Sequence, residues 1–397
     1  MKSEPRLPRI ALVWAQFTDY HVDRCGAVAR RLAGRAEVIA VELATASQVY
    51  AWEPSGPVPG AHKITLFPGQ QVEAVSLWRR FAAQFRVLRQ CRAVFFGVGY
   101  NEPDIIALAW LLRLTGVTVV MMTDSKFDDK PRRAWFELFK LAVLLPYSAA
   151  IVAGKRQFSY VRLLGFRRRR VLPGYDGVSV ERIRAQAARP LAPEGLPFAD
   201  RPFTYVGRFI EKKNLERLLE GYALYVAAAG AGARRLQLVG AGPLESQLRR
   251  RAEQLGVAGS VDFLGFRTST EVSGLLADSL ALLLVSTVEQ WGLVVNEALA
   301  VGLPVIVSHP VGARDLLVRN LVNGFTVGPR SPETMAAAML ELCRNEGVWR
   351  DMVAKSHAMA WLGDCERLAD AVELILFPNA EEAAGTVQAL SAALELA

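Results

Sequence analysis

The feature that most constrains the fold of this 397-residue chain is an alternation of short apolar runs with amphipathic segments of helical length. In the first half, runs such as RIALVW, AVFFGV and VTVVMM are followed or preceded by segments with helical spacing. This alternation is typical of crossover units around a parallel sheet that helices cover on both faces. We therefore predict a doubly wound α/β domain.

A break in this pattern divides the chain. Residues 185–202 read AQAARPLAPEGLPFADRP, are rich in Pro and Ala, and lack periodicity, which is typical of an interdomain linker. Alternation then resumes with FTYVGR, LQLVG, VDFLGF and SLALLLVS. We predict a first domain over residues 1–190 and a second over 200–357. Ligands in such sheets bind beyond the carboxyl ends of the strands, so a cleft where two such ends face each other is the expected site.

Composition excludes several classes of protein. Apolar residues make up 52% of the chain and charged residues 22%, as in ordinary globular proteins. Its four cysteines lie far apart without CxxC spacing, so we expect buried thiols in a reducing cytosol and no metal site. No run approaches the roughly 18 apolar residues of a membrane span, and the start MKSEPRLPRI lacks the features of an export signal. The net charge of +8 fits anionic partners.

The segment FTYVGRFIEKKN has the features of a phosphate site. A strand ends at Gly207, Arg208 and the pair Lys212 and Lys213 follow, and Asn214 opens a helix. A glycine lets a ligand approach the backbone, and cations attract anions. The alternative is that these cations only solvate a loop, as basic loop residues commonly do.

The segment LQLVGAGPLESQL leaves two interpretations open. Gly240 and Gly242 follow a strand, and Asp262 lies about twenty positions further on, as in a dinucleotide-binding fingerprint. However, Glu245 stands where the third glycine of that fingerprint belongs. A tight turn closed by Gly-Pro is at least as good an interpretation.

The segment EQWGLVVNE places two carboxylates around a strand-to-helix turn. Gly292 and Leu293 are expected at the helix start, Glu289 in the preceding loop, and Glu297 about one turn inside the helix. Carboxylates beside a phosphate site suit the vicinal hydroxyls of sugars, because each oxygen accepts a hydrogen bond. The alternative is a solvated Glu289 and a Glu297 on the helix surface.

Together these motifs resemble the retaining GT-B glycosyltransferases of family 4. The motifs are GRFIEKKNLERLLEGY, LVGAGPLESQL, VDFLGF, EQWGLVVNEALAVGLPVIVS and LVNGFTVGP, in this order. The resemblance is strong over residues 200–330 and looser over the first half. It implies two Rossmann-like domains that face a central cleft, with a C-terminal helix at about 358–378 that packs back on the first domain.

The resemblance also implies roles for individual residues. Arg208 and Lys213 match the pair that binds the donor diphosphate, Glu297 matches the glutamate on the ribose hydroxyls, and Glu289 matches the one at the donor sugar. The backbone at Gly207, Gly292 and Leu293 would contact the sugar or diphosphate, and that at Gly265 and Phe266 would border the base. Neither a metal nor a cofactor is expected, because cations and helix amides take the place of the metal.

The first half departs from the family pattern at two loops. Asp19, Tyr20 and His21 stand where many relatives carry paired glycines, and MMTDSKFDDK stands where many carry a histidine near the reacting carbon. We carry Asp124 over as a candidate catalytic polar group on the acceptor side, a role in which Ser125 or Lys126 could also serve. In the second half, His309 follows the strand PVIVS, and a structural role there is as reasonable as contact with the acceptor.

A basic amphipathic segment raises the question of membrane attachment. Over residues 76–92, apolar side chains recur at helical spacing among five arginines, and a second basic group follows at residues 167–170. Such a helix could lie on an anionic bilayer. A core-facing helix with a solvated arginine face is the alternative.

We therefore predict a retaining, metal-independent hexosyltransferase that moves a sugar from a nucleotide-diphosphate donor to a hydroxyl of a glycan or lipid-linked acceptor. Surface polysaccharide or glycolipid synthesis at the inner face of the cell membrane is the expected context, with no nucleic acid as partner. The alternatives are a noncatalytic nucleotide-sugar-binding protein and a GT-B sugar-nucleotide epimerase. The chain holds four histidines, few for an epimerase that needs acid and base groups near the sugar.

Overall fold

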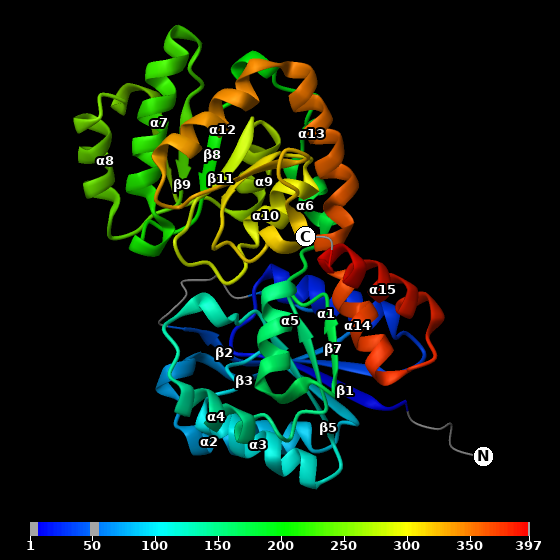
Figure 1. Cartoon of the computed structure of the whole chain (residues 1–397). Coiled ribbons are helices and arrows are strands. Elements are labelled where there is room, and N and C mark those ends of the chain that lie inside the picture. Colours follow the sequence, from blue (N-terminus) through cyan, green and yellow to red (C-terminus); the bar gives the residue numbers. More distant parts are fainter. Residues whose placement is uncertain (1–6, 48–54, 396–397) are drawn as a thin grey trace. The chain divides into compact units, whose positions relative to one another are not determined.

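The computed structural model describes residues 7–47 and 55–395, and the chain divides into two compact units (Figure 1). Unit 1 runs to Ser179 and resumes at Cys365, and unit 2 is Val180–Asp364. Residues 1–6, on which part of the expectation about an export signal rests, lie outside the described residues.

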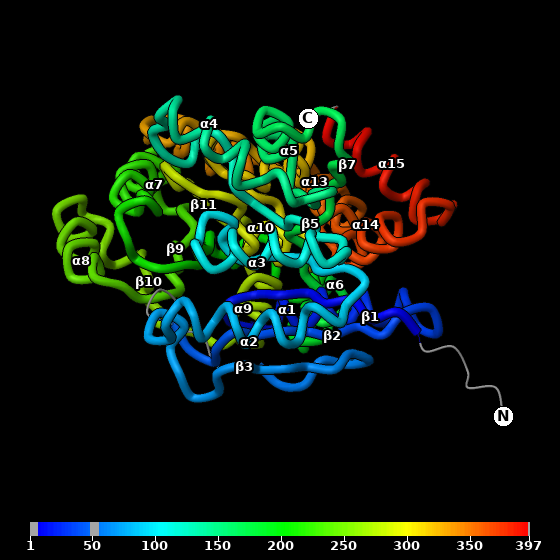
Figure 2. The backbone as a smooth tube through the Cα atoms, turned by 90° about the horizontal axis from the view of Figure 1, so that it is seen from below, coloured from blue at the N-terminus to red at the C-terminus, as the bar shows by residue number. Residues whose placement is uncertain are grey.

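Unit 1 is built on a parallel sheet in the order β3-β2-β1-β4-β5-β6-β7. Figure 2 shows β3 at one edge of this sheet, beside β2. The strands are β1 (Arg9–Trp14), β2 (Glu37–Ala46), β3 (His62–Gln71), β4 (Ala93–Phe96), β5 (Thr118–Thr123), β6 (Ala149–Val152) and β7 (Arg170–Pro173). The direction of the chain across the sheet reverses between β1 and β4.

Helices cover both faces of this sheet, as the apolar strands require. The helices of unit 1 are α1 (Asp19–Arg31), α2 (Leu77–Leu88), α3 (Pro103–Leu114), α4 (Ala134–Val143), α5 (Lys155–Val161), α14 (Glu366–Leu376) and α15 (Glu381–Glu395). Ile10 and Leu12 of β1 face a core shared with α1 and α14, whereas Ala11 and Val13 face a second core shared with α3 and α5. α14 packs against α1 although the two are far apart in sequence (Figure 1).

Unit 2 repeats this architecture with a parallel sheet in the order β10-β9-β8-β11-β12-β13. Its strands are β8 (Phe203–Val206), β9 (Leu236–Val239), β10 (Val261–Gly265), β11 (Ala281–Leu284), β12 (Val305–Ser308) and β13 (Gly324–Val327). Its helices are α6 (Val180–Ala187), α7 (Leu215–Ala229), α8 (Glu245–Gln254), α9 (Ser269–Ala277), α10 (Val294–Ala300), α11 (Arg314–Leu317), α12 (Pro332–Arg344) and α13 (Glu346–Met359). β11 and β12 at the centre of this sheet are fully buried, whereas β10 at its edge is mostly half-buried.

The boundary between the units lies earlier than the predicted residue 190. α6 packs against α9, so the segment from Val180 onward belongs to unit 2. The Pro-rich break that suggested the boundary follows α6 and lies inside unit 2. The second unit also runs to Asp364, beyond the expected 357.

The basic segment of residues 76–92 forms α2, and part of it is buried. Phe81 and Phe85 pack against the core and Leu88 is fully buried, as a core-facing helix requires. Arg80 is also buried, with its guanidinium paired to the carboxylates of Glu102 and Asp104. Arg80 is therefore not part of a solvated arginine face. Among the described residues, no helix is long and apolar enough to span a membrane.

Candidate functional site

The loop after β8 begins with a glycine in a conformation that other residues rarely adopt. Gly207 has φ +152°, and a Cβ there would lie 2.7 Å from the Tyr205 hydroxyl oxygen. That hydroxyl donates to the carbonyl oxygen of Arg208 at 3.1 Å. Burial raises the pKa of Tyr205 well above its ordinary value, the Glu289 carboxylate raises it further, and the Arg208 cation opposes both. Tyr205 therefore remains a neutral donor close to two predicted site residues.

An ion pair joins the loop after β8 to the loop after β11. The Lys213 ammonium contacts the Glu289 carboxylate, and the two side chains are 15% and 12% exposed. The Ser286 hydroxyl donates to the same carboxylate at 3.0 Å. Asn214 donates from Nδ2 to the carbonyl oxygen of Val285 at 2.9 Å, which holds the two loops together on the other side of Lys213. Two predicted site residues 76 positions apart therefore meet directly.

The order of strands explains why these loops meet. β8 lies beside β11, while β9 and β10 lie on one side of this pair and β12 and β13 on the other. This is the position where the winding of an α/β sheet reverses, and ligands of such sheets bind at the carboxyl ends of strands at this position.

The turn after β11 leads into α10 as the sequence predicts. Gly292 has φ +101°, and a Cβ there would approach Leu284 Cδ2 to 2.8 Å. Leu293 directly precedes α10, and its carbonyl oxygen accepts from the Glu297 N–H at 3.2 Å. Glu297 is only 6% exposed. It is thus a buried carboxylate and not a residue of the helix surface.

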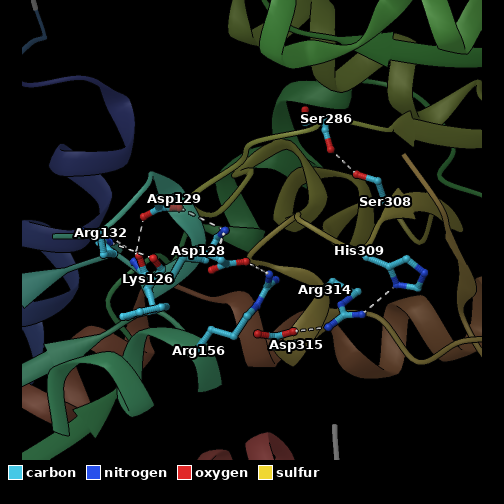
Figure 3. A network of polar contacts seen from close by, with 11 residues as sticks. Lys126, Asp128, Asp129, Arg132, Arg156, Ser286, Ser308, His309, Arg314 and Asp315 are labelled. Atoms are coloured by element: carbon cyan, nitrogen blue, oxygen red, sulfur yellow. Dashed lines mark hydrogen bonds and ion pairs between the residues drawn. The ribbon is translucent and has the colours of Figure 1, made fainter. Parts of the chain in front are cut away.

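Residues from β12 extend the same edge of the sheet (Figure 3). The Ser308 hydroxyl donates to the carbonyl oxygen of Ser286 at 2.6 Å, which ties the ends of β11 and β12 together. His309 is exposed and lies 3.2 Å from Arg314 through its Nδ1. Arg314 also donates to Asp315 at 3.0 Å. His309 therefore has a polar partner of its own within unit 2.

The glycines after β9 serve packing between loops. A Cβ at Gly240 would lie 2.0 Å from the Gly207 carbonyl oxygen, and one at Gly242 would lie 2.5 Å from the Phe209 carbonyl oxygen. Asp262 lies near the start of β10 and pairs with Arg235 at 2.6 Å, away from the carboxyl ends of the strands. The geometry therefore favours the tight-turn interpretation over the dinucleotide fingerprint.

The turn after β10 adjoins these loops. Gly265 has φ +70°, and its carbonyl oxygen accepts from the Gly240 N–H at 2.8 Å. The following Phe266 is 68% exposed, so its ring is available to a flat ligand. That these residues border a nucleotide base stays a prediction.

Asp124 of unit 1 lies directly after β5 in a polar cluster of its own. Burial first, and then the neighbouring Asp176 carboxylate, raise its pKa to about 7. Asp176 is itself buried and pairs with Arg24 at 3.1 Å, while Arg24 Nε donates to the Gly177 carbonyl oxygen at 2.9 Å. Asp124 is therefore a carboxyl group that carries a proton near neutral pH, as a general acid or base requires.

His21 has a structural contact in this part of unit 1. Its Nδ1 accepts from the Thr18 N–H at 3.0 Å, at the start of α1. Burial lowers the pKa of His21 well below its usual range, and the Arg24 cation lowers it further. The loop that replaces the paired glycines of many relatives is thus the capped first turn of α1.

Sequence reasoning missed the buried pair of Arg24 and Asp176, and it did not foresee that Lys126, an alternative to Asp124, is buried and paired. Lys126 is fully buried and pairs with Asp128 at 3.1 Å and Asp129 at 3.2 Å (Figure 3). The signal for Lys126 was present in SKFDDK, where one lysine precedes two aspartates. Arg24 and Asp176 are 152 residues apart, so no local pattern in the sequence indicated their pairing.

Comparison with known proteins finds a family match within unit 2. Residues 192–359 match the family described as glycosyl transferases group 1. An uncharacterised glycosyltransferase of Methanocaldococcus jannaschii is 30% identical over 142 residues, which is 36% of this chain and 35% of that protein. A GDP-mannose-dependent α-(1-6)-phosphatidylinositol dimannoside mannosyltransferase of Mycobacterium tuberculosis is 32% identical over 136 residues, which is 34% of this chain and 33% of that protein. The aligned part thus spans about a third of these curated relatives.

Solved structures show that the likeness in fold extends over nearly the whole chain. Sucrose-phosphate synthase from Thermosynechococcus elongatus has a TM-score of 0.68 at 18% identity, with 93% of this chain and 98% of that chain covered. Anabaena HepE in complex with UDP and glucose has a TM-score of 0.67 at 16% identity, with 93% and 99% covered. The predicted fold is therefore confirmed, while the assignment to family 4 stays a prediction. The chain has the GT-B fold, and its residues 192–359 are similar to the family of glycosyl transferases group 1.

Proposed function

We propose that this chain transfers a sugar from a nucleotide-diphosphate donor to a hydroxyl of a glycan or lipid-linked acceptor, with retention of configuration and without a metal. The observation that carries the proposal is the ion pair of Lys213 and Glu289 where the loops after β8 and β11 meet. This ion pair supports a site in which the two side chains separate when a donor binds. Lys213 would then bind the diphosphate, and Glu289 would bind the sugar.

The chemistry follows from the charges around this pair. When a donor binds, Lys213 and the exposed Arg208 are the cations available to a diphosphate, and they would stabilise the charge on the leaving group. Glu289, released from Lys213, would accept hydrogen bonds from sugar hydroxyls. Glu297, a buried carboxylate one turn inside α10, would accept them from the ribose.

The acceptor side of the proposal rests on Asp124. With a pKa of about 7, its carboxyl group exchanges a proton near neutral pH and is suited to a polar contact with an acceptor hydroxyl. The mycobacterial relative is named for a phosphatidylinositol dimannoside, and colanic acid and amylovoran biosynthesis appear in the names of two others. On that basis we propose that the acceptor of this chain is lipid-linked or a polysaccharide, and that the chain attaches peripherally to an anionic membrane surface.

The experiment is a panel of UDP-, GDP-, ADP- and dTDP-sugars, measured by thermal shift and by slow hydrolysis. UDP-sugars come first because HepE was crystallised with UDP-glucose. We expect one donor to raise the melting temperature and to be hydrolysed, and Lys213→Ala and Glu297→Ala to abolish both effects. Lys212→Ala, the neighbouring exposed lysine, is the matched control and should behave as wild type.

Three outcomes distinguish the alternatives. Binding without hydrolysis or transfer would favour a noncatalytic nucleotide-sugar-binding protein, and a donor epimerised without an acceptor would favour an epimerase. If no sugar nucleotide binds, the proposal fails. The anomeric configuration of a product, read by NMR, tests retention, and activity in the presence of EDTA tests independence from metal.

A further inference from the structure

Helix α4 of unit 1 turns most of its apolar residues outward, while Lys140 is buried beside Val143 on its inner side. The side chains of Trp135, Leu138 and Phe139 are 65%, 66% and 55% exposed, whereas Lys140 is 4% exposed. A surface helix of a globular domain normally has the opposite distribution, with its apolar stripe toward the core. The composition of the helix does not explain this inversion, but the contacts of its inner face do.

A polar network fixes the inner face of α4. Lys140 Nζ donates to Glu137 Oε1 at 2.8 Å and to the Tyr160 hydroxyl at 2.7 Å, and that hydroxyl donates to Glu137 Oε2 at 2.7 Å. The Arg132 guanidinium lies over the Tyr160 ring, 4.6 Å from its centroid. Although burial acts in the opposite direction, the hydrogen bonds from Lys140 and Tyr160 lower the pKa of Glu137. The helix could turn its apolar side inward only by breaking this network.

The exposed apolar residues form one patch, which we call the α4 surface. It consists of Trp135, Phe136, Leu138, Phe139, Leu141 and Leu145. The rings of Trp135 and Phe136 are in contact, with centroids 5.6 Å apart, and those of Phe136 and Phe139 are 6.4 Å apart. Contiguous exposed patches of this kind mark surfaces that another molecule or a membrane covers.

Cations lie at both ends of the α4 surface. Lys130 and Arg133 are exposed just before the helix. At its other end, Arg169 donates to the carbonyl oxygens of Leu144 and Tyr147 at 2.7 and 3.0 Å, which brings the basic run at residues 167–170 to the end of α4. The acid of α4 itself, Glu137, is engaged on the inner face.

We propose that the α4 surface docks unit 1 on an anionic lipid bilayer. Its rings and leucines would enter the boundary between headgroups and acyl chains, and the cations at its ends would contact headgroup phosphates. The proposal rests on the proposed function and adds to it the surface that binds the membrane. A second copy of the chain fits less well, because a two-fold contact sets the same patch against itself and would bring cation against cation.

This docking also gives the neighbouring loop a role. Asp124 begins the loop between β5 and α4. Within this loop Arg132 donates to the Phe127 carbonyl oxygen at 2.9 Å, and its guanidinium pairs with Glu137 of the helix at 3.8 Å. Lys126 holds the same loop through Asp128 and Asp129 (Figure 3). With α4 on the bilayer, the hydroxyl of a lipid-linked acceptor would reach Asp124 from the headgroup layer.

The test compares two matched double variants of the full chain. Trp135→Ser with Leu138→Ser changes the α4 surface, and Trp78→Ser with Leu77→Ser changes the exposed start of α2, where Trp78 is 74% and Leu77 48% exposed. Each protein is floated with vesicles of equal parts phosphatidylcholine and phosphatidylglycerol, and with vesicles of phosphatidylcholine alone. We expect wild type and the α2 variant to float with the anionic vesicles. The α4 variant should lose on the order of a hundredfold in partitioning, as expected for two apolar side chains kept in water.

Two further measurements test the role of charge in docking and show whether docking is independent of donor hydrolysis. Arg133→Ser should lower partitioning into the anionic vesicles about fivefold, as one cation near the surface contributes about that factor. Hydrolysis of the sugar nucleotide without vesicles should be the same in all variants, so a failure of the donor panel and a failure of docking are seen separately. The proposal is overturned if wild type does not float, if the α4 variant floats as well as wild type, if the α2 variant alone loses binding, or if the α4 substitutions change only the oligomeric state.

Discussion

Replacing Lys213 tests the proposed donor site most directly, because its ammonium already holds a carboxylate in the place proposed for a diphosphate. Lys213→Ala removes the cation and leaves Glu289 with the hydrogen bond from Ser286. Glu289→Gln removes the competing charge instead and leaves Lys213 in place. If the ion pair exchanges for the ligand, Lys213→Ala should weaken diphosphate binding and Glu289→Gln should not.

The magnitude follows from the burial of the pair. A cation about 4 Å from a phosphate contributes up to about 4 kcal/mol at an effective dielectric constant of about 20. Part of this is lost because Lys213, at 15% exposure, must first give up Glu289. A hydrogen bond to a charged group contributes about 1.5 to 3 kcal/mol net, so Lys213→Ala should weaken binding roughly 10- to 150-fold. Glu289→Gln should leave binding unchanged or tighten it, while hydrolysis falls.

Isothermal titration calorimetry with the preferred nucleoside diphosphate, and with the nucleoside alone, measures these effects. Lys213→Ala should weaken the diphosphate and leave the nucleoside unchanged, and Lys212→Ala should change neither. An equal loss for both ligands would mean that Lys213 supports the fold of the loop and does not bind phosphate. Tighter binding in Lys213→Ala would refute the reasoning outright.

Three further predictions concern stability. Asp124 has a folded pKa of about 7 against an ordinary value near 4. The folded state therefore holds the extra proton, and the free energy of unfolding falls as pH rises from about 4 to about 7. In thermal melts across that range Asp124→Asn should show less of this fall, and parallel curves for the variant and wild type would contradict the prediction. Gly242→Ala should lower the free energy of unfolding by about 1 to 3 kcal/mol, because the added Cβ would meet the Phe209 backbone. An unchanged denaturation midpoint would contradict the packing role of this glycine and leave the dinucleotide interpretation open. In denaturant unfolding, Arg80→Ala should lower the free energy of unfolding by about 3 to 5 kcal/mol, because it leaves Asp104 buried without its cation. Arg86→Ala on the same helix should lower it far less. Equal losses would show that the ion pair of Arg80 does not stabilise the fold.

The strands and their loops were predictable because they depend on local patterns. Short apolar runs such as ALLL and VIVS, bounded by turn signals, are typical of strands buried on both faces, and a glycine at position 292 before a helix indicates a turn. The pairing of Lys213 with Glu289 was not predictable, since it depends on which strands lie side by side. Sheet order is a property of the whole unit.

The error in the domain boundary has a related origin. The prolines of residues 185–202 are a strong local break, but α6 had already joined unit 2. The local signal outweighed the tertiary contacts. The outward apolar side of α4 could not be predicted from AWFELFKLAV either, because it depends on the contacts of Glu137 and Lys140.

The interrupted course of unit 1 has a consequence for how the chain is made. Leu368 and Val372 of α14 are fully buried in the core that β1 and α1 also build, so this core is incomplete until residues beyond Cys365 have been synthesised. Unit 2 is continuous from Val180 to Asp364 and has all of its residues earlier. On the ribosome, the second unit is therefore in a position to fold before the first, contrary to the usual order from the N-terminus. Until α14 emerges, the exposed apolar face of unit 1 is the part of the nascent chain that most needs a chaperone.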